Sequence, residues 1–258
     1  MTGEPTAFRG AVIALALGAG ALAFAQPADA AGPKLRDGLF GRRAPDGRQF
    51  TAPPVARYVS EDGVGFTLDR TQPRPLLKFD NSPEVWALSP HPAPRGDVIY
   101  KNDLGHPVVR ATRLGGLTVF TPGRPAGSAA ALIGGGPPLR LAQLGPQALL
   151  EKLAQSSARA SRAARRLIPF DAEASPASSA LIADAAVVTS EAMVRMTRTP
   201  RTRALLDRIR RVRLVEGRRA GAEISQGTLI VMVAPQQGLA GRPSSERIVA
   251  VANTPGDD

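Results

Sequence analysis

The chain has 258 residues and a formal net charge of +11, which allows one or two domains with a substantial hydrophobic core. It contains no cysteine, which excludes disulfides, thiolate zinc sites, cysteine nucleophiles and a lipid-modified N-terminal cysteine. Aromatic residues make up only 4% of the chain, so the core must be largely aliphatic. The excess of base attracts polyanions, although an arginine-, alanine- and glycine-rich composition is also what GC-rich coding produces.

Residues 1–30 have the pattern of a secretory signal peptide. Arg9 precedes an apolar run from Gly10 to Ala25, and small-x-small cleavage patterns follow it. Cleavage before Gln26 or before Ala31 fits this pattern, and the second is preferred because Pro27 lies beside the first. An uncleaved anchor is the alternative, but the run is shorter than the roughly 20 residues that cross a bilayer. We therefore expect an exported protein, periplasmic or associated with the envelope.

A flexible lead is expected over residues 31–54, where glycine, proline and charged residues alternate with little apolar periodicity. A single α+β domain should follow over residues 55–253. Its first part, residues 55–121, predicts an antiparallel β-meander, because segments rich in Val, Ile, Leu, Phe and Thr are separated by turn residues. The expected strands are 55–59, 64–69, 76–79, 84–88, 97–101, 108–113 and 117–121. The core anchors should be Phe66, Phe79, Trp86 and Phe120.

A connector rich in glycine and proline is expected over residues 122–138, after which the apolar period changes from two to about 3.6. Residues 145–211 should therefore be helical. The first helix should cover residues 145–168. Ser175-Pro176 and Thr199-Pro200 each place proline at the first turn and should open the second and third helices.

The C-terminal part, residues 212–253, predicts strands that return to the sheet of the meander. These strands are expected at 212–216, 222–225, 228–234 and 247–252, with a tight turn at Gln226-Gly227. Residues 229–233 are continuously apolar, which predicts a strand that is buried on both faces.

Four segments together resemble an exported proteobacterial family described only as a domain of unknown function. They are Leu77 to Leu88, Arg95 to Asp103, Thr112 to Gly116 and Gly238 to Ile248. The resemblance spans about residues 55–252 and implies export and one continuous domain. It brings no active-site motif with it.

No pattern in the chain indicates a catalytic, cofactor or metal site. The only histidines, His91 and His106, each lie next to proline, and neither has a set of ligands around it for zinc. Nucleophile elbows and phosphate-binding loops are also missing. One enzymatic alternative remains, an envelope hydrolase that uses two carboxylates of the meander at about 5 to 9 Å. The candidates are Asp80, Glu84, Asp97 and Asp103, for each of which a turn or cap role is the simpler interpretation.

The stretch from Arg198 to Arg219 holds nine arginines against Asp207 and Glu216, a local charge of +7. It could bind anionic envelope components, such as lipid headgroups or acidic polysaccharide, or be an ordinary solvated surface. Arg201, Arg208 and Arg211 should point outward, because Leu205, Leu206 and Ile209 should face the core. Nucleic acid is not an expected partner, since export removes the chain from it. The leading hypothesis is a non-enzymatic binding or structural protein with a basic surface.

Overall fold

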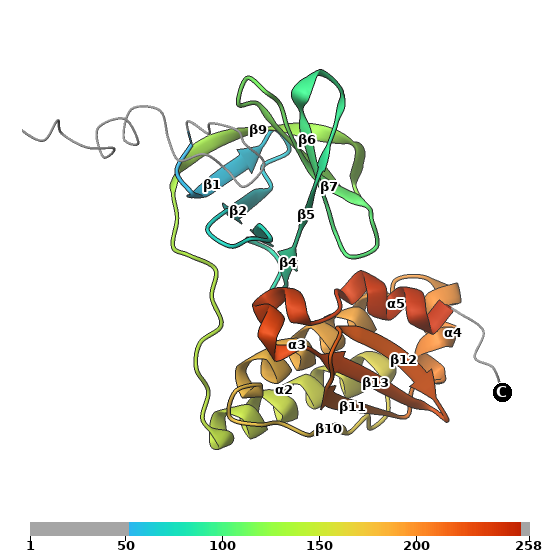
Figure 1. The fold of residues 1–258 in the computed structure, drawn as a ribbon. Helices are drawn as coiled ribbons and strands as arrows, with labels where there is room; N and C mark the ends of the chain where they lie inside the picture. The colour runs from blue at the N-terminus through green and yellow to red at the C-terminus, as the bar shows by residue number, and fades with distance from the viewer. Residues whose placement is uncertain (1–51, 254–258) are drawn as a thin grey trace, which may run out of the picture.

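The computed structural model describes residues 52–253, which form two units that pack against each other (Figure 1). The predicted signal peptide and residues 31–51 of the predicted lead lie outside the described residues. The first unit, residues 52–135, is a curved β-sheet, and the second, residues 146–253, combines helices with a smaller sheet. Each unit has its own cluster of buried apolar side chains. The chain is therefore a mixed α+β protein, as predicted.

The first unit is a nine-stranded antiparallel sheet with the strand order β4-β3-β2-β1-β9-β8-β7-β6-β5. Its two edge strands are separated in sequence by Leu88 alone, so the sheet curls until it is nearly a barrel (Figure 1). The strands are β1 Val55–Ser60, β2 Gly65–Asp69, β3 Leu76–Phe79, β4 Val85–Ala87, β5 Ser89–Pro92, β6 Val98–Lys101, β7 Pro107–Ala111, β8 Leu117–Thr121 and β9 Arg124–Gly135, with a short 3-10 turn η1 Pro94–Gly96.

The β-meander is confirmed, and its alternating apolar residues fill the inside of the sheet. Tyr58 lies opposite Phe66, which lies opposite Phe79, so three aromatic rings line up across β1, β2 and β3. Phe66 and Trp86 are buried as expected, whereas Phe79 and Phe120 are half-buried. Strand β5 was not predicted, because its two prolines argue against a strand; its place at the sheet edge tolerates them.

The expected connector over residues 122–138 is wrong, because most of it is β9, the longest strand of the sheet. This strand pairs with both β1 and β8 and so joins the two halves of the meander. Its sequence is rich in alanine and glycine and gives little sign of a strand, since the pairing partners rather than its own propensity supply the hydrogen bonds. Gly127 lies in β9 at φ +89°, where an added Cβ would lie 2.5 Å from Thr118 Cγ2.

The second unit contains three helices in the predicted helical segment, but a short strand, Phe170–Ala172, lies between the first two, and the second helix begins at Ser179 rather than at Ser175-Pro176. The helices are α2 Pro146–Ala164, α3 Ser179–Met196 and α4 Pro200–Asp207. Thr199 caps α4 by accepting a hydrogen bond from the Thr202 amide at 3.2 Å, as the Thr-Pro pattern suggested. Leu206 of α4 and Ile209, which follows this helix, are both fully buried. No helix within residues 52–253 is both long and apolar enough to cross a membrane.

The C-terminal strands do not return to the first sheet; they form a second sheet of their own, which corrects that prediction. Its order is β10-β11-β13-β12, with β10 Phe170–Ala172, β11 Arg211–Glu216, β12 Gly221–Ser225 and β13 Thr228–Val233. Helices α2 and α3 pack on this sheet, and α5 contacts β12. Val231 is buried beneath them, but Ile230 and Met232 on the other face are half-exposed, so β13 is not buried on both faces.

Residues 247–252 are not a strand but part of helix α5, Ser245–Asn253. The Ser244 hydroxyl accepts a hydrogen bond from the Arg247 amide at 3.0 Å, which caps the helix, and Ile248 and Ala252 share its buried face. The β-branched residues suggested a strand, but the cap and the i, i+4 burial decide for a helix. A 3-10 turn, η2 Pro235–Gly241, connects β13 to the segment before α5.

Candidate functional site

A polar seam joins the two units, and Glu84 lies at its centre. The Glu84 side chain is fully buried between the first sheet and the start of α5. One carboxylate oxygen accepts a hydrogen bond from the Ser245 amide at 2.8 Å, and the other accepts one from the Ser245 hydroxyl. Because Ser245 is also fully buried, its hydroxyl holds the seam together and is closed to molecules in solvent.

Two arginines surround the same carboxylate. Arg242 Nη1 lies 3.9 Å from Glu84, its Nε pairs with Asp184 of α3, and its Nη2 donates to the Val85 carbonyl at 2.8 Å. Arg195 lies 3.5 Å from Glu84 with its guanidinium over the Trp86 ring. Burial raises the pKa of Glu84, while Arg242, the Ser245 donors and Arg195 oppose that rise. The seam is thus a paired network of charges between the units.

A second group of contacts extends the seam to the loop between β6 and β7. Asp103 accepts hydrogen bonds from the Ser244 amide at 2.9 Å, the Ser244 hydroxyl at 2.6 Å and Arg247 Nε at 3.2 Å. Asn102 donates to Glu246 at 2.8 Å. The turn at residues 102–105 between β6 and β7 therefore also anchors α5. Together these contacts fix the walls of a groove between the units.

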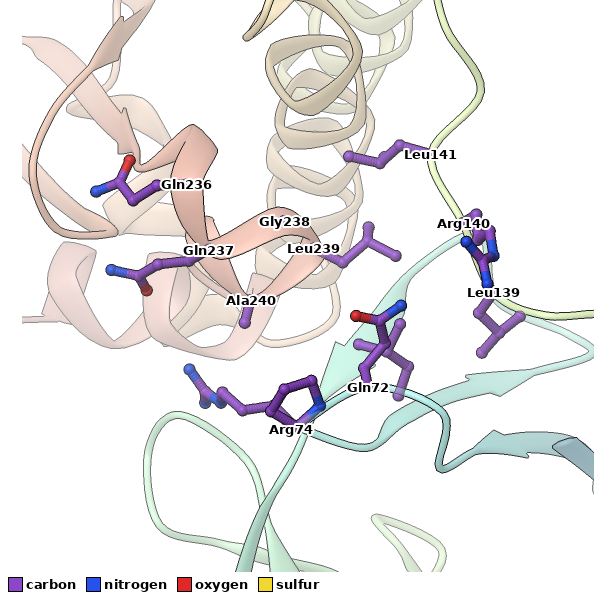
Figure 2. A pocket seen from close by; sticks show the side chains of 12 residues that line it. Gln72, Arg74, Leu139, Arg140, Leu141, Gln236, Gln237, Gly238, Leu239 and Ala240 are labelled. Atoms are coloured by element: carbon purple, nitrogen blue, oxygen red, sulfur yellow. The ribbon is translucent and has the colours of Figure 1, made fainter. Parts of the chain in front are cut away.

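The groove opens between η2 and the chain that links the two units. Its first half has a volume of about 700 Å³ and lies among residues 72–76, 139–141 and 236–240. In Figure 2, the 139–141 segment faces η2 across the groove, and Gln72 and Arg74 come from the loop before β3. The wall is formed mainly by leucines and small residues, with three glutamines and two arginines among them. This volume lies within the range of small-molecule sites.

The second half of the groove has a volume of about 660 Å³ and is more polar. It shares Arg74, Gln237 and Ala240 with the first half, so the two are adjacent. Its other lining residues include Arg219 and Arg247. A small cavity of about 20 Å³ beside the shared wall reaches Trp86, the only tryptophan of the chain.

The charge of the groove is positive, and part of it is not neutralised. Arg242 and Arg247 already pair with Asp184 and Asp103. Arg140 and Arg219, by contrast, have no ion pair within residues 52–253. Arg74 has no ion pair within these residues either, and its Nη2 donates to the Ser89 hydroxyl at 3.3 Å. These three guanidinium groups are therefore available to an anion.

The arginines singled out from the sequence lie elsewhere. Arg201 and Arg208 are exposed on α4 and at its end, and Arg211 is exposed at the start of β11. None of the three lines the groove. Arg211 lies 3.9 Å from Asp171 of β10, and Arg213 pairs with Glu173, which follows β10, so these two carboxylates lower the net charge counted from the stretch alone.

The four carboxylates of the hydrolase alternative are each held by a separate set of partners. Asp80 pairs with Arg57 at 3.0 Å, Asp97 with Arg110 at 2.6 Å, and Glu84 and Asp103 belong to the seam. Of these, Asp103 alone lines the groove. This arrangement gives no support to a pair of carboxylates acting together on one substrate.

The histidines and other metal-binding residue types are dispersed. His106 lies 3.3 Å from Glu246, and His91 is exposed on β5. Within residues 52–253, no three such side chains converge to hold a metal ion.

Sequence reasoning missed the groove, although a signal was present. Glu84, Asp103, Arg242 and Ser245 all lie in the segments that carried the family resemblance. Those segments are far apart in sequence and meet at the seam. Arg74 and Arg140, in contrast, lie in proline-rich or irregular segments with nothing to mark them as a pair.

Comparisons with known proteins agree with that resemblance. A family model described as "Domain of unknown function (DUF4908)" matches residues 34–252. Searches of curated proteins and of solved structures find no match.

Proposed function

Because the chain belongs to this family of unknown function, whose description names no activity, we propose a function from the geometry. The protein is a non-enzymatic binding protein that holds an anionic ligand in the groove between its two units. The observation that carries the proposal is the set of three available guanidinium groups, Arg74, Arg140 and Arg219, around one groove. Guanidinium forks match phosphate and carboxylate, and a partly desolvated groove strengthens such pairs.

The residues that line the groove are also better suited to binding a ligand than to catalysing a reaction on it. Two of the arginines that line it, Arg242 and Arg247, are held in ion pairs, and the Ser245 hydroxyl is fully buried. A rigid seam keeps both walls in place, which limits the ordering cost of binding. The ligand belongs to the class expected from the sequence, the anionic components of the cell envelope.

This proposal includes export. It is supported by the pattern of Arg9, the apolar run and the small residues before Ala31. The mature protein should begin near Gln26 or Ala31 when its N-terminus is sequenced. Soluble cytoplasmic material that begins at Met1 or Thr2 would contradict it.

The binding site is tested by titration of the protein with butyl phosphate and with butanol, using Trp86 fluorescence as the signal. Saturable binding of the phosphate is expected, and it should weaken as salt rises. Arg74→Gln and Arg219→Gln should each weaken it by about tenfold or more, the loss of one charge-assisted hydrogen bond. Arg218→Gln is the matched control, because Arg218 is exposed beside Arg219 but does not line the groove. Equal binding by all three variants and the wild type would overturn the proposal.

A further inference from the structure

The two halves of the groove differ in chemistry, and that difference identifies the kind of ligand. Seven of the twelve residues that line the first half are apolar or glycine, namely Pro73, Leu76, Leu139, Leu141, Gly238, Leu239 and Ala240, and the other five are Gln72, Arg74, Arg140, Gln236 and Gln237. The second half contains only small apolar residues, Ala220, Ala240 and Pro243, among charged and polar side chains. One end of the groove therefore favours hydrocarbon and the other favours an anion.

Resting on the proposed function, we propose that the ligand is a single-chain anionic amphiphile, such as an alkyl or acyl phosphate. Its hydrocarbon chain lies along the leucines of the first half. Its anionic head lies in the second half, where Arg219 has no acidic partner within residues 52–253. Arg74 lines both halves, so it stands at the junction of head and chain.

The leucines that line the first half belong to two segments, one on each side of the groove, and each segment is held in place by contacts within the protein. Leu139 and Leu141 are half-buried, and Leu139 is held by its amide, which donates to Asp69 at 2.8 Å. Leu239 extends from η2 toward this segment (Figure 2). The η2 turn is closed by a hydrogen bond from the Ala234 amide to the Gly241 carbonyl at 2.7 Å, and position 241 has no room for a Cβ, which would lie 2.0 Å from the Ala234 carbonyl oxygen. Both apolar walls are thus preformed, and a chain between them removes the exposed parts of Leu139 and Leu141 from water, whereas Leu76 and Leu239 are already buried.

The test is a series of alkyl phosphates from four to twelve carbons, kept below their micelle concentrations and followed by Trp86 fluorescence. Affinity should rise by up to about fourfold per methylene, the value for full burial, until the chain fills the groove. Leu139→Ser should flatten this dependence on chain length, whereas Leu150→Ser, an exposed leucine of α2 outside the groove, should not. Arg219→Gln should weaken all chain lengths by the same factor, and Arg218→Gln should leave them unchanged.

The outcomes separate this inference from the proposed function. An affinity that does not change with chain length would overturn the amphiphile and leave the anion site standing. Equal binding of alkyl phosphates and the corresponding alcohols, or no binding of either, would overturn the anion site as well. A parallel titration with vesicles of anionic phospholipid distinguishes the source of the ligand. A response to vesicles together with none to free alkyl phosphates would place the binding on a membrane surface and overturn both the single-chain assignment and the anion site in the groove.

Discussion

Ser245 donates two hydrogen bonds to the carboxylate of Glu84, from its amide at 2.8 Å and from its hydroxyl, across 161 residues of sequence. Both residues are fully buried, so this contact ties the core of the first unit to the start of α5. The carboxylate would otherwise lie out of water with fewer donors. The docking of the two units, and with it the groove, depends on such contacts.

Ser245→Ala should therefore lower the free energy of unfolding by about 1–3 kcal/mol, because one donor to a buried carboxylate is lost. Urea denaturation measures this change. Ser225→Ala on the exposed side of β12 is the control and should change stability by less than about 0.5 kcal/mol. Equal effects of the two substitutions would show that the Ser245 hydroxyl contributes little to docking.

Glu216 should make the stability of the folded protein depend on pH in the acidic range. Hydrogen bonds from the Ser178 hydroxyl and then from Ser175 hold the pKa of Glu216 below its ordinary value of 4.5. A carboxyl with a lowered folded-state pKa adds stability above its unfolded-state pKa and loses it as pH falls through the folded-state value. Between about pH 6 and about pH 3, Glu216→Gln should thus lose less unfolding free energy than the wild type. The control is Glu223→Gln on β12, which removes the same charge and should lose as much unfolding free energy as the wild type over this pH range. If Glu223→Gln instead loses as little as Glu216→Gln, the effect comes from net charge and not from the hydrogen bonds of Glu216.

Gly127 is required by the backbone of β9. Replacement by alanine should destabilise the protein by about 1–3 kcal/mol, because the residue has positive φ and the new Cβ meets Thr118 and Phe120. Gly134→Ala in the same strand is the control, since its Cβ would meet no atom within 4 Å. Thermal or urea unfolding compares the two. Similar stabilities would mean that β9 does not hold the sheet in the way described.

His91 and His106 should be dispensable. The double replacement by alanine removes one exposed pair, His106 with Glu246, which contributes less than about 1 kcal/mol. Unfolding should be nearly unchanged, and metal analysis should give the same result for both proteins. A transition metal that is bound by the wild type and lost in the double variant would contradict this prediction.

We still predict that Arg201, Arg208 and Arg211 contact an anionic surface such as a membrane. Their replacement by glutamine should weaken binding to anionic vesicles by about one to two orders of magnitude, since each cation contributes about 1 kcal/mol near such a surface. Arg211 should contribute least, because Asp171 lies 3.9 Å away. Binding should also weaken between 0.1 M and 1 M salt, as the Debye length falls from about 10 Å to about 3 Å. Cosedimentation measures both effects.

The control for that surface is the replacement of Arg95, Arg113 and Arg162 by glutamine, an equal loss of charge at exposed positions elsewhere. Equal losses by the two triple variants would assign the binding to net charge. Binding that does not depend on salt would mean that Arg201, Arg208 and Arg211 are ordinary solvated surface residues without a role in binding.

The sequence by itself determined the elements whose signals are local. The strands expected at residues 64–69 and 76–79, the start of a helix at Thr199-Pro200 and the Gln226-Gly227 turn each depend on neighbours in the chain, and the structure has each of them. The absence of cysteine and the family resemblance are likewise properties of the sequence, and the family is confirmed.

The tertiary structure decided what depends on partners far along the chain. Strand β9 exists because β1 and β8 supply its hydrogen bonds, and the C-terminal strands form a second sheet because β11 pairs in parallel with β10 and β13. The groove needs Arg74, Arg140 and Arg219 from three separate segments. The apolar periodicity of a single segment cannot predict that these three arginines come together. Their relative positions are fixed only when the seam around Glu84 docks one unit on the other.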